Sequence, residues 1–259
     1  MLLRCIVVGG AALVLTMSVS SCGSDSPPPS AAGGVTGTIV VFAASSLTDS
    51  FTEIGAAFEA THPGTSVSFN FAGSGDLATQ IIQGAPADVF ASAAESSMTT
   101  LVDAGQNAGA PVVIARNTFE IIVEPGNPTA IVSVADLARP DLVVVLCAES
   151  VPCGAGAAAV LAKAGVAVTP KSYEEKAKGV VTKVTAGEAD AGIVFVTDVR
   201  AAGTSATGVE IPTDVNVISR YPIVVTNEAP NPVAARAFTD FVAGLQGQAV
   251  LASYGFLAP

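Results

Sequence analysis

Basic side chains are scarce in this chain of 259 residues, which has 11 Lys and Arg against 22 Asp and Glu and a formal net charge of −11. No Lys or Arg lies between Arg4 and Arg116. A nucleic-acid-binding protein needs a basic face to neutralise phosphates, so we expect no nucleic acid partner. A ligand held by residues 5–115 is therefore uncharged, cationic, or an anion bound without basic side chains.

Tryptophan is absent and histidine occurs once, at His62. A sugar receptor stacks sugar rings on aromatic side chains, and this chain has few of them. A metal site with several histidines is excluded, because there is only one histidine. His62 lies in a His-Pro-Gly turn that we expect to be exposed. With Ser46 it could resemble the His–Ser pair of a hydrolase. The chain has no G-x-S-x-G motif to present a nucleophile, however. We therefore predict a binding protein rather than an enzyme, with no cofactor.

The first 22 residues read as an export signal. Arg4 precedes a short apolar run that ends near Met17, which is typical of a signal peptide and too short for a spanning helix. Val19-Ser20-Ser21-Cys22 is similar to a bacterial lipobox, in which the chain is cut before the cysteine and that cysteine is lipidated. The alternative is an ordinary signal peptide with an incidental cysteine. We expect a signal peptide at 1–21, a lipid anchor at Cys22 on the outer face of the membrane, and a Pro-rich tether at 22–36.

Two of the four cysteines, Cys147 and Cys153, belong to the exported part without a lipid role. An exported protein sits in an oxidising compartment, so a local disulfide is the default. A metal site is a poor alternative, because no histidine is nearby and only two sulfurs are available. We expect this disulfide to fix the shape of its loop.

Hydrophobic residues make up 50% of the chain and charged residues 13%, so we expect it to be folded over most of its length. Apolar, β-rich segments alternate with segments of helical spacing, which predicts an α/β fold with largely parallel sheets. The expected strands are 38–44, 67–71, 88–91, 119–123, 142–146, 191–196 and 221–226. The expected helices are 51–62, 77–82, 154–164, 173–187 and 232–245.

Three of these strands end in the same way, with small residues, Ser or Gly just before a helix. Ser46, Ser74 and Cys153 occupy these positions. Ligands of open α/β sheets bind beyond the carboxyl ends of strands, and free N–H groups at helix starts bind small anions without basic side chains. The alternative is that the two serines are simply N-caps. Both serines together with the Cys153 loop favour a binding site.

From about Thr38 to its end, the chain resembles the molybdate-binding proteins, which are the extracytoplasmic receptors of molybdate ABC importers. The matching stretches are VFAASSLTDSF, FNFAGSGDLATQIIQGAPADVFASA, VPCGAGAA, GEADAGIVFVTDV and ARAFTDFVAGLQGQAVLASYGF. The second stretch is the most specific of the five. The resemblance implies a two-lobed periplasmic-binding-protein fold of type II, with a mainly parallel sheet in each lobe and the ligand in the cleft between them. Lobe one would comprise 37–115 plus 222–259, and lobe two 116–221.

The resemblance also implies a set of ligand groups for a tetrahedral oxyanion. Family members use the serine hydroxyls at the positions of Ser46 and Ser74, and a backbone N–H at the position of Cys153. A further backbone N–H aligns with Ala177. Many relatives add a Tyr hydroxyl at the position of Phe195, which has none. Tyr173 and Ser45 are the candidates to replace it.

The function implied is capture of molybdate, and also of tungstate, by a lipid-anchored monomer that closes its lobes and docks on a permease and its ATPase. Two alternatives stay open: a receptor for another oxyanion such as sulfate, and a surface lipoprotein that keeps the fold without transport. Asp88 would repel an anion, so we interpret it as structural. Arg116 is interpreted as a solvated surface residue.

Overall fold

The computed structural model describes residues 34–259. The predicted signal peptide at 1–21, the lipid anchor at Cys22 and most of the tether at 22–36 lie outside the described residues. Residues 35–259 form one compact unit. Among the described residues, no helix combines the length and the apolar character that crossing a membrane requires.

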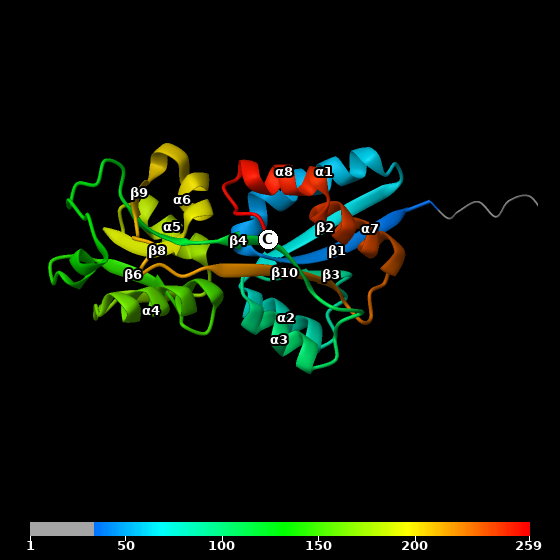
Figure 1. Ribbon diagram of the computed structural model, residues 1–259, viewed down its shortest axis with the longest axis horizontal. Helices are drawn as coiled ribbons and strands as arrows, with labels where there is room; N and C mark the ends of the chain where they lie inside the picture. The colour runs from blue at the N-terminus through cyan, green and yellow to red at the C-terminus, as the bar shows by residue number, and fades with distance from the viewer. Residues whose placement is uncertain (1–33) are drawn as a thin grey trace, which may run out of the picture. The chain divides into compact units, whose positions relative to one another are not determined.

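The unit contains two mixed five-stranded sheets flanked by helices, and we call each sheet with its helices a lobe (Figure 1). The first lobe contains β1 (Gly37–Ala44), η1 (Ser45–Leu47), α1 (Thr48–Thr61), β2 (Thr65–Ala72), α2 (Ser74–Ile82), β3 (Val89–Ala91), α3 (Glu95–Asp103), β4 (Val112–Asn117), β10 (Ser219–Val225), α7 (Pro232–Ala243) and α8 (Leu245–Ser253). The second lobe contains β5 (Phe119–Val123), η2 (Val134–Ala138), β6 (Val144–Cys147), α4 (Pro152–Ala164), β7 (Ser172–Glu174), α5 (Ala177–Thr185), β8 (Ala191–Phe195), α6 (Val196–Ala202), η3 (Gly203–Ser205) and β9 (Thr207–Glu210).

The strand order is β2-β1-β3-β10-β4 in the first sheet and β7-β6-β8-β5-β9 in the second. The pairings of β10 with β3 and β4 are antiparallel, as are those of β5 with β8 and β9, and the others are parallel. Each sheet therefore has one strand that opposes the other four. These are the strands through which the chain enters a sheet from the other lobe, β5 directly after β4 and β10 after β9. The predicted two-lobed α/β fold is confirmed, with this reversed strand added to each sheet.

Helix α1 shows why the predicted spacing forms a helix here. Phe51, Ile54 and Phe58 recur on one face and are fully buried. The ring of Phe58 packs edge-on against Phe238 of α7, with the ring centres 5.3 Å apart. Burial of such side chains contributes about 1.5–3 kcal/mol each, which fixes the C-terminal helices over the first sheet. The C-terminal strand-like segment returns to β4, where Leu257 bridges Arg116.

One predicted helix begins later than expected. The spacing predicts a helix over 173–187, but Ser172–Glu174 forms strand β7 and the helix α5 starts at Ala177. Strand β7 pairs in parallel with β6, and the partner of Tyr173 is Leu146. Pairing at the sheet edge thus overrides the local helical pattern, and it shortens the helix so that its first residue is Ala177.

Candidate functional site

A small cavity between the lobes brings together the four residues that the sequence predicts to bind a ligand. Its volume is about 10 Å³, which is room for about one water molecule. The first lobe lines it with Ala44, Ser45, Ser46, Ala72, Gly73, Ser74 and Ala93, and the second with Val151, Pro152, Cys153, Glu175, Lys176, Ala177 and Phe195. Ser46, Ser74, Cys153 and Ala177 thus meet around one point, together with the unusual Phe195. That they bind an anion stays a prediction.

The cavity wall is built from helix starts. Ser74 is the first residue of α2, Cys153 the second of α4, and Ala177 the first of α5. None of these three helices has a side-chain cap, whereas the remote α7 is capped by Asn231. The first N–H groups of a helix have no partner within it and carry partial positive charge. Three helices therefore present donors to the same small space.

Ser74 is not an N-cap, because it lies within α2 and its side chain bonds elsewhere. Its Oγ accepts a hydrogen bond of 3.0 Å from the Ala93 N–H, and the residue is 1% exposed. A hydroxyl has one hydrogen to donate and can accept at the same time. With Ala93 donating to the oxygen, the hydroxyl hydrogen of Ser74 is free to point at a ligand.

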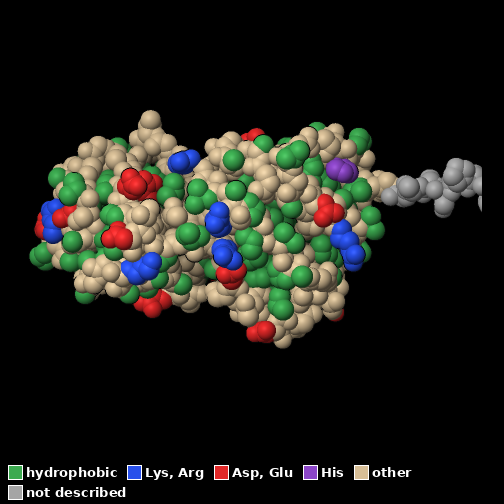
Figure 2. Space-filling model, in the orientation of Figure 1, with side chains coloured by type: hydrophobic (Ala, Val, Ile, Leu, Met, Phe, Trp, Pro, Cys, Tyr) green, Lys and Arg blue, Asp and Glu red, His purple; other side chains and the backbone are tan. Residues whose placement is uncertain are grey.

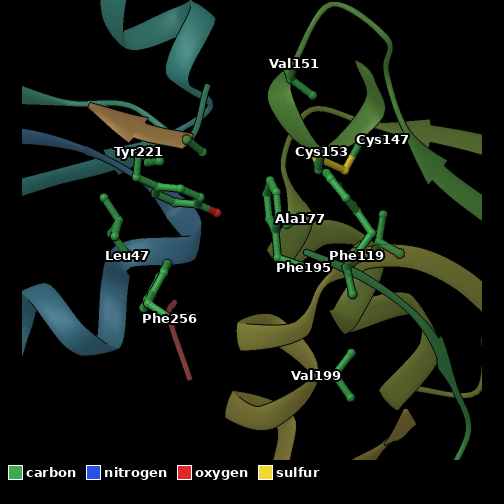
Figure 3. Close-up of a cluster of buried hydrophobic side chains, with 14 of the residues drawn as sticks. Leu47, Phe119, Cys147, Val151, Cys153, Ala177, Phe195, Val199, Tyr221 and Phe256 are labelled. Atoms are coloured by element: carbon green, nitrogen blue, oxygen red, sulfur yellow. A yellow bond between two sulfur atoms is a disulfide. The ribbon is translucent and has the colours of Figure 1, made fainter. Parts of the chain in front are cut away.

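Ser46 is not an N-cap either, and its partner was missed by the sequence reasoning. Its Oγ lies 3.1 Å from the hydroxyl oxygen of Tyr221, at the start of β10. The Tyr221 hydroxyl also accepts from Asn117 Nδ2 at 3.3 Å. Figure 3 shows Tyr221 projecting from the first lobe with its hydroxyl turned toward Phe195 and Ala177 of the second. No motif marks Tyr221 in the sequence, because the contact joins residues 175 positions apart.

The disulfide predicted between Cys147 and Cys153 is present (Figure 3). It ties the end of β6 to the first turn of α4, so it spans the loop that carries the Cys153 N–H. The next residue, Gly154, is required by close approach: a Cβ there would lie 1.9 Å from the Ala148 carbonyl oxygen. The loop is therefore held both by a covalent bond and by tight backbone packing.

Removing this disulfide tests its role in binding. In a Cys147→Ser/Cys153→Ser variant we expect a free energy of unfolding lower by about 2 kcal/mol, because a short closed loop restricts the unfolded chain only modestly. We also expect weaker ligand binding, because the loop presenting the Cys153 N–H loses its brace. Urea unfolding and calorimetry measure the two effects separately. Unchanged affinity would contradict the role in binding.

Phe195 lines the cavity at the position where the family resemblance implies a hydroxyl. It is 1% exposed, and its ring centre lies 4.6 Å from that of Phe119 and 5.7 Å from that of Tyr221. Of the two replacement candidates, Ser45 lines the cavity. Tyr173 is wrong as a candidate, because it is 57% exposed on the edge strand β7 and does not line the cavity.

The charge around the cavity is sparse. Lys176 is the one basic residue that lines it among the described residues, and its side chain is exposed. Lys178, two residues further along α5, forms an ion pair of 3.0 Å with Asp49 of α1 and so joins the two lobes. On the face seen in Figure 2, the basic side chains are few and do not merge into a continuous patch. The polar groups that line the cavity are therefore mostly neutral donors.

Asp198 of α6 is buried beside this interlobe contact. Within residues 34–259, neither of its carboxyl oxygens has a hydrogen-bond partner. Burial raises its pKa to about 7, although the cation of Lys178 opposes the shift. The neutral form of Asp198 therefore persists to higher pH than that of an exposed aspartate.

A larger cavity of about 510 Å³ lies beside the segments that join the lobes. Glu120 and Glu210, which line it, are paired across β5 and β9. Burial raises the pKa of Glu120, and Arg200 in the same wall partly offsets this. Because it holds two carboxylates, this cavity is a poor place for an anion, despite its size. Within residues 34–259, no cluster of His, Cys, Asp and Glu could hold a metal ion.

The residues set aside from the site have structural contacts. Asp88 is buried and accepts hydrogen bonds from the backbone N–H groups of Val40 and Asn231, which confirms its structural interpretation. Arg116 is half-buried and its Nε donates to the Ala258 carbonyl, so it holds the C-terminal segment rather than lying free in solvent. His62 is half-buried rather than exposed, because its ring stacks on Phe58 at 4.2 Å.

The sequence and the fold are both similar to those of known solute-binding proteins. Residues 39–257 match the family described as bacterial extracellular solute-binding protein. The molybdate-binding protein ModA of Mycobacterium tuberculosis is 43% identical over 97% of each chain. A Bacillus subtilis relative whose name includes the words "substrate-binding lipoprotein" is 29% identical over 96% of each chain. The solved periplasmic molybdate-binding protein of Azotobacter vinelandii shares the fold with a TM-score of 0.76, at 19% identity over 85% of this chain and 99% of that one.

Proposed function

Because the chain belongs to the bacterial extracellular solute-binding proteins, we propose that it captures molybdate outside the cell and delivers it to an ABC importer. The 43% identity to a molybdate-binding protein along nearly the whole chain supports the choice of ligand. A capture protein of this kind binds and releases its ligand unchanged. Its partners are then the oxyanion, a membrane permease and the ATPase that drives it.

The observation that carries this proposal is the convergence of two serine hydroxyls and three uncapped helix starts on one cavity. A tetrahedral oxyanion has four oxygens that accept hydrogen bonds from different directions. Ser46 and Ser74 supply donors from the first lobe, and the N–H groups of Cys153 and Ala177 supply donors from the second. Each half of the site is incomplete without the other, so binding favours closure of the lobes.

Selectivity follows from a site that only donates. An anion that carries a proton, such as hydrogen phosphate, needs an acceptor for it, and the hydroxyl and N–H groups proposed as ligands all donate to the anion. Molybdate and tungstate are nearly equal in size, so we propose that both bind. Sulfate is smaller, and donors fixed at the spacing of molybdate would hold it less well.

Entry of the ligand requires the lobes to separate, because the cavity holds about one water as it stands. We propose that the lobes turn about the two segments where the chain crosses between sheets, near Thr118 after β4 and over 211–218 before β10. The limits 115/116 and 221/222 predicted from the sequence fall inside β4 and β10, a few residues to the first-lobe side of these crossings. Closure then forms the Lys178–Asp49 ion pair across the gap.

Anchoring by lipid at Cys22, after removal of residues 1–21, completes the proposal. The lipobox-like sequence and the lipoprotein name of the Bacillus subtilis relative support it. The tether at 22–36 would then let the receptor reach its permease from the outer face of the membrane. Labelling of the expressed protein with a radioactive fatty acid, with Cys22→Ala as control, checks the anchor.

Isothermal titration calorimetry with molybdate, tungstate, sulfate and phosphate tests the function. We expect saturable heat with molybdate and tungstate, and at least tenfold weaker binding of sulfate. No heat with any of the four would contradict oxyanion capture and favour a surface lipoprotein that has only kept the fold. A preference for sulfate would contradict the choice of ligand.

A further inference from the structure

We propose that Tyr221 is a positioning residue that turns the hydroxyl hydrogen of Ser46 toward the bound oxyanion. The inference rests on the proposed function and deepens it, because it concerns a residue of the same site. It also explains how the proposed site can hold an oxyanion although Phe195 has no hydroxyl. The argument comes from the direction of each hydrogen bond in a chain that leads to Ser46.

The chain begins at Asn117, the last residue of β4, whose side-chain amide has a fixed orientation. Its Oδ1 accepts the backbone N–H of Thr118 at 3.0 Å, so its Nδ2 must lie on the opposite side. The Nδ2 group donates to Thr197 Oγ1 at 2.8 Å and to the Tyr221 hydroxyl at 3.3 Å. An amide nitrogen can only donate, so the Tyr221 oxygen is an acceptor in this contact.

Within residues 34–259 the Tyr221 hydroxyl makes one other hydrogen bond, to the Ser46 oxygen at 3.1 Å, and we assign Tyr221 as its donor. On its other sides the Tyr221 ring is enclosed by apolar rings, with Phe195 and Phe256 packed edge-on at 5.7 and 5.2 Å. Since Ser46 accepts from Tyr221, its own hydrogen is left for the cavity. Ser46 is thereby set in the same state as Ser74, whose oxygen accepts from Ala93.

Burial keeps this arrangement constant over the physiological range. Tyr221 is fully buried, and burial raises the pKa of its hydroxyl well above the ordinary value. The hydroxyl therefore stays protonated and keeps its direction. Hydrogen bonds in series polarise one another, so the Ser46 hydroxyl becomes a stronger donor than an isolated one.

The position of Tyr221 explains why it acts through Ser46. It does not line the cavity, whereas Ser46 does. The ring of Phe195, on the second lobe, packs edge-on against the Tyr221 ring. The hydroxyl that the family resemblance implies at position 195 is thus compensated by one that strengthens a donor of the first lobe.

The test is a set of molybdate titrations by calorimetry on four proteins: wild type, Tyr221→Phe, Ser46→Ala and the double variant. We expect Tyr221→Phe to lower the affinity about tenfold, while the same change in the Ser46→Ala background alters it less than twofold. Non-additivity of this kind identifies residues that act through each other. Tyr254→Phe is the matched control, because it removes an identical hydroxyl that bonds to Glu53 on the surface, and its affinity should equal that of wild type.

Two outcomes would overturn the inference. If Tyr221→Phe binds like wild type, Tyr221 does not position Ser46. If Tyr221→Phe lowers the affinity tenfold both in the wild type and in the Ser46→Ala background, the role of Tyr221 is only structural. In the first case, a lowered affinity of Ser45→Ala would identify Ser45 as the compensating group. If the wild-type protein shows no heat with molybdate, the proposed function fails as well, so the two failures can be told apart. The unfolding temperature of each ligand-free variant establishes that the variant is folded.

Discussion

Replacing Ser74 by alanine is expected to weaken molybdate binding by roughly 10- to 100-fold, the range for loss of a hydrogen bond to a charged group. Ser74 is buried at the start of α2, and its hydroxyl hydrogen is free because Ala93 already donates to the oxygen. Calorimetric titration of Ser74→Ala with molybdate measures the loss.

Ser96→Ala is the matched control, since it removes an exposed hydroxyl from the first turn of α3. It should bind as tightly as wild type. Ser74→Ala also leaves the Ala93 N–H without its acceptor, so thermal unfolding of the ligand-free variant must accompany the titration. A folded Ser74→Ala protein with wild-type affinity would remove Ser74 from the proposed ligand set.

Asp198→Asn is expected to flatten the dependence of stability on pH. The pKa of Asp198 is raised to about 7 by burial, whereas an unfolded Asp ionises near 4. Between these values the native state binds more protons than the unfolded state, so the free energy of unfolding falls as pH rises. Ionisation of Asp198 lowers the free energy of unfolding of the wild type by on the order of 4 kcal/mol at pH 8. Below pH 4 this destabilisation disappears.

Urea unfolding of both proteins at pH 5 and pH 8 measures this effect. We expect Asp198→Asn to match wild type more closely at pH 5, where Asp198 is largely neutral, and to exceed it by several kcal/mol at pH 8. Asp103→Asn, at the exposed end of α3, is the control. It should change the free energy of unfolding by the same amount at pH 5 and at pH 8. Equal pH dependence in wild type and Asp198→Asn would mean that Asp198 is already ionised in the native protein at pH 5.

The parts of the site that the sequence predicts are those with a local signature. Ser46, Ser74 and Cys153 each follow an apolar strand and precede or begin a helix, and such a strand end can be recognised within about ten residues. Their meeting in one cavity follows from the fold, since these helix starts face the gap between the sheets. The disulfide was equally local, with its cysteines six positions apart.

Tyr221 and Asp198 could not be found in this way. The contact between Tyr221 and Ser46 depends on the register of β10 against β3 and β4 after the chain has passed through the whole second lobe. The raised pKa of Asp198 depends on how deeply α6 is buried beside the interlobe ion pair. Both properties arise from packing between distant segments, which no short pattern encodes. The early start predicted for α5 fails for a related reason, because pairing with β6 decides the state of residues 172–174.

The small volume of the cavity has a consequence for the speed of capture. With room for about one water, the closed form admits no oxyanion, so arrival is possible only during the intervals in which the lobes stand apart. The rate of uptake then levels off at high molybdate concentration, where it equals the rate of opening rather than that of diffusion. Release of the bound ion also requires the lobes to open. A permease that holds the lobes apart would therefore shorten the lifetime of the complex without competing for any of the groups that hold the ion.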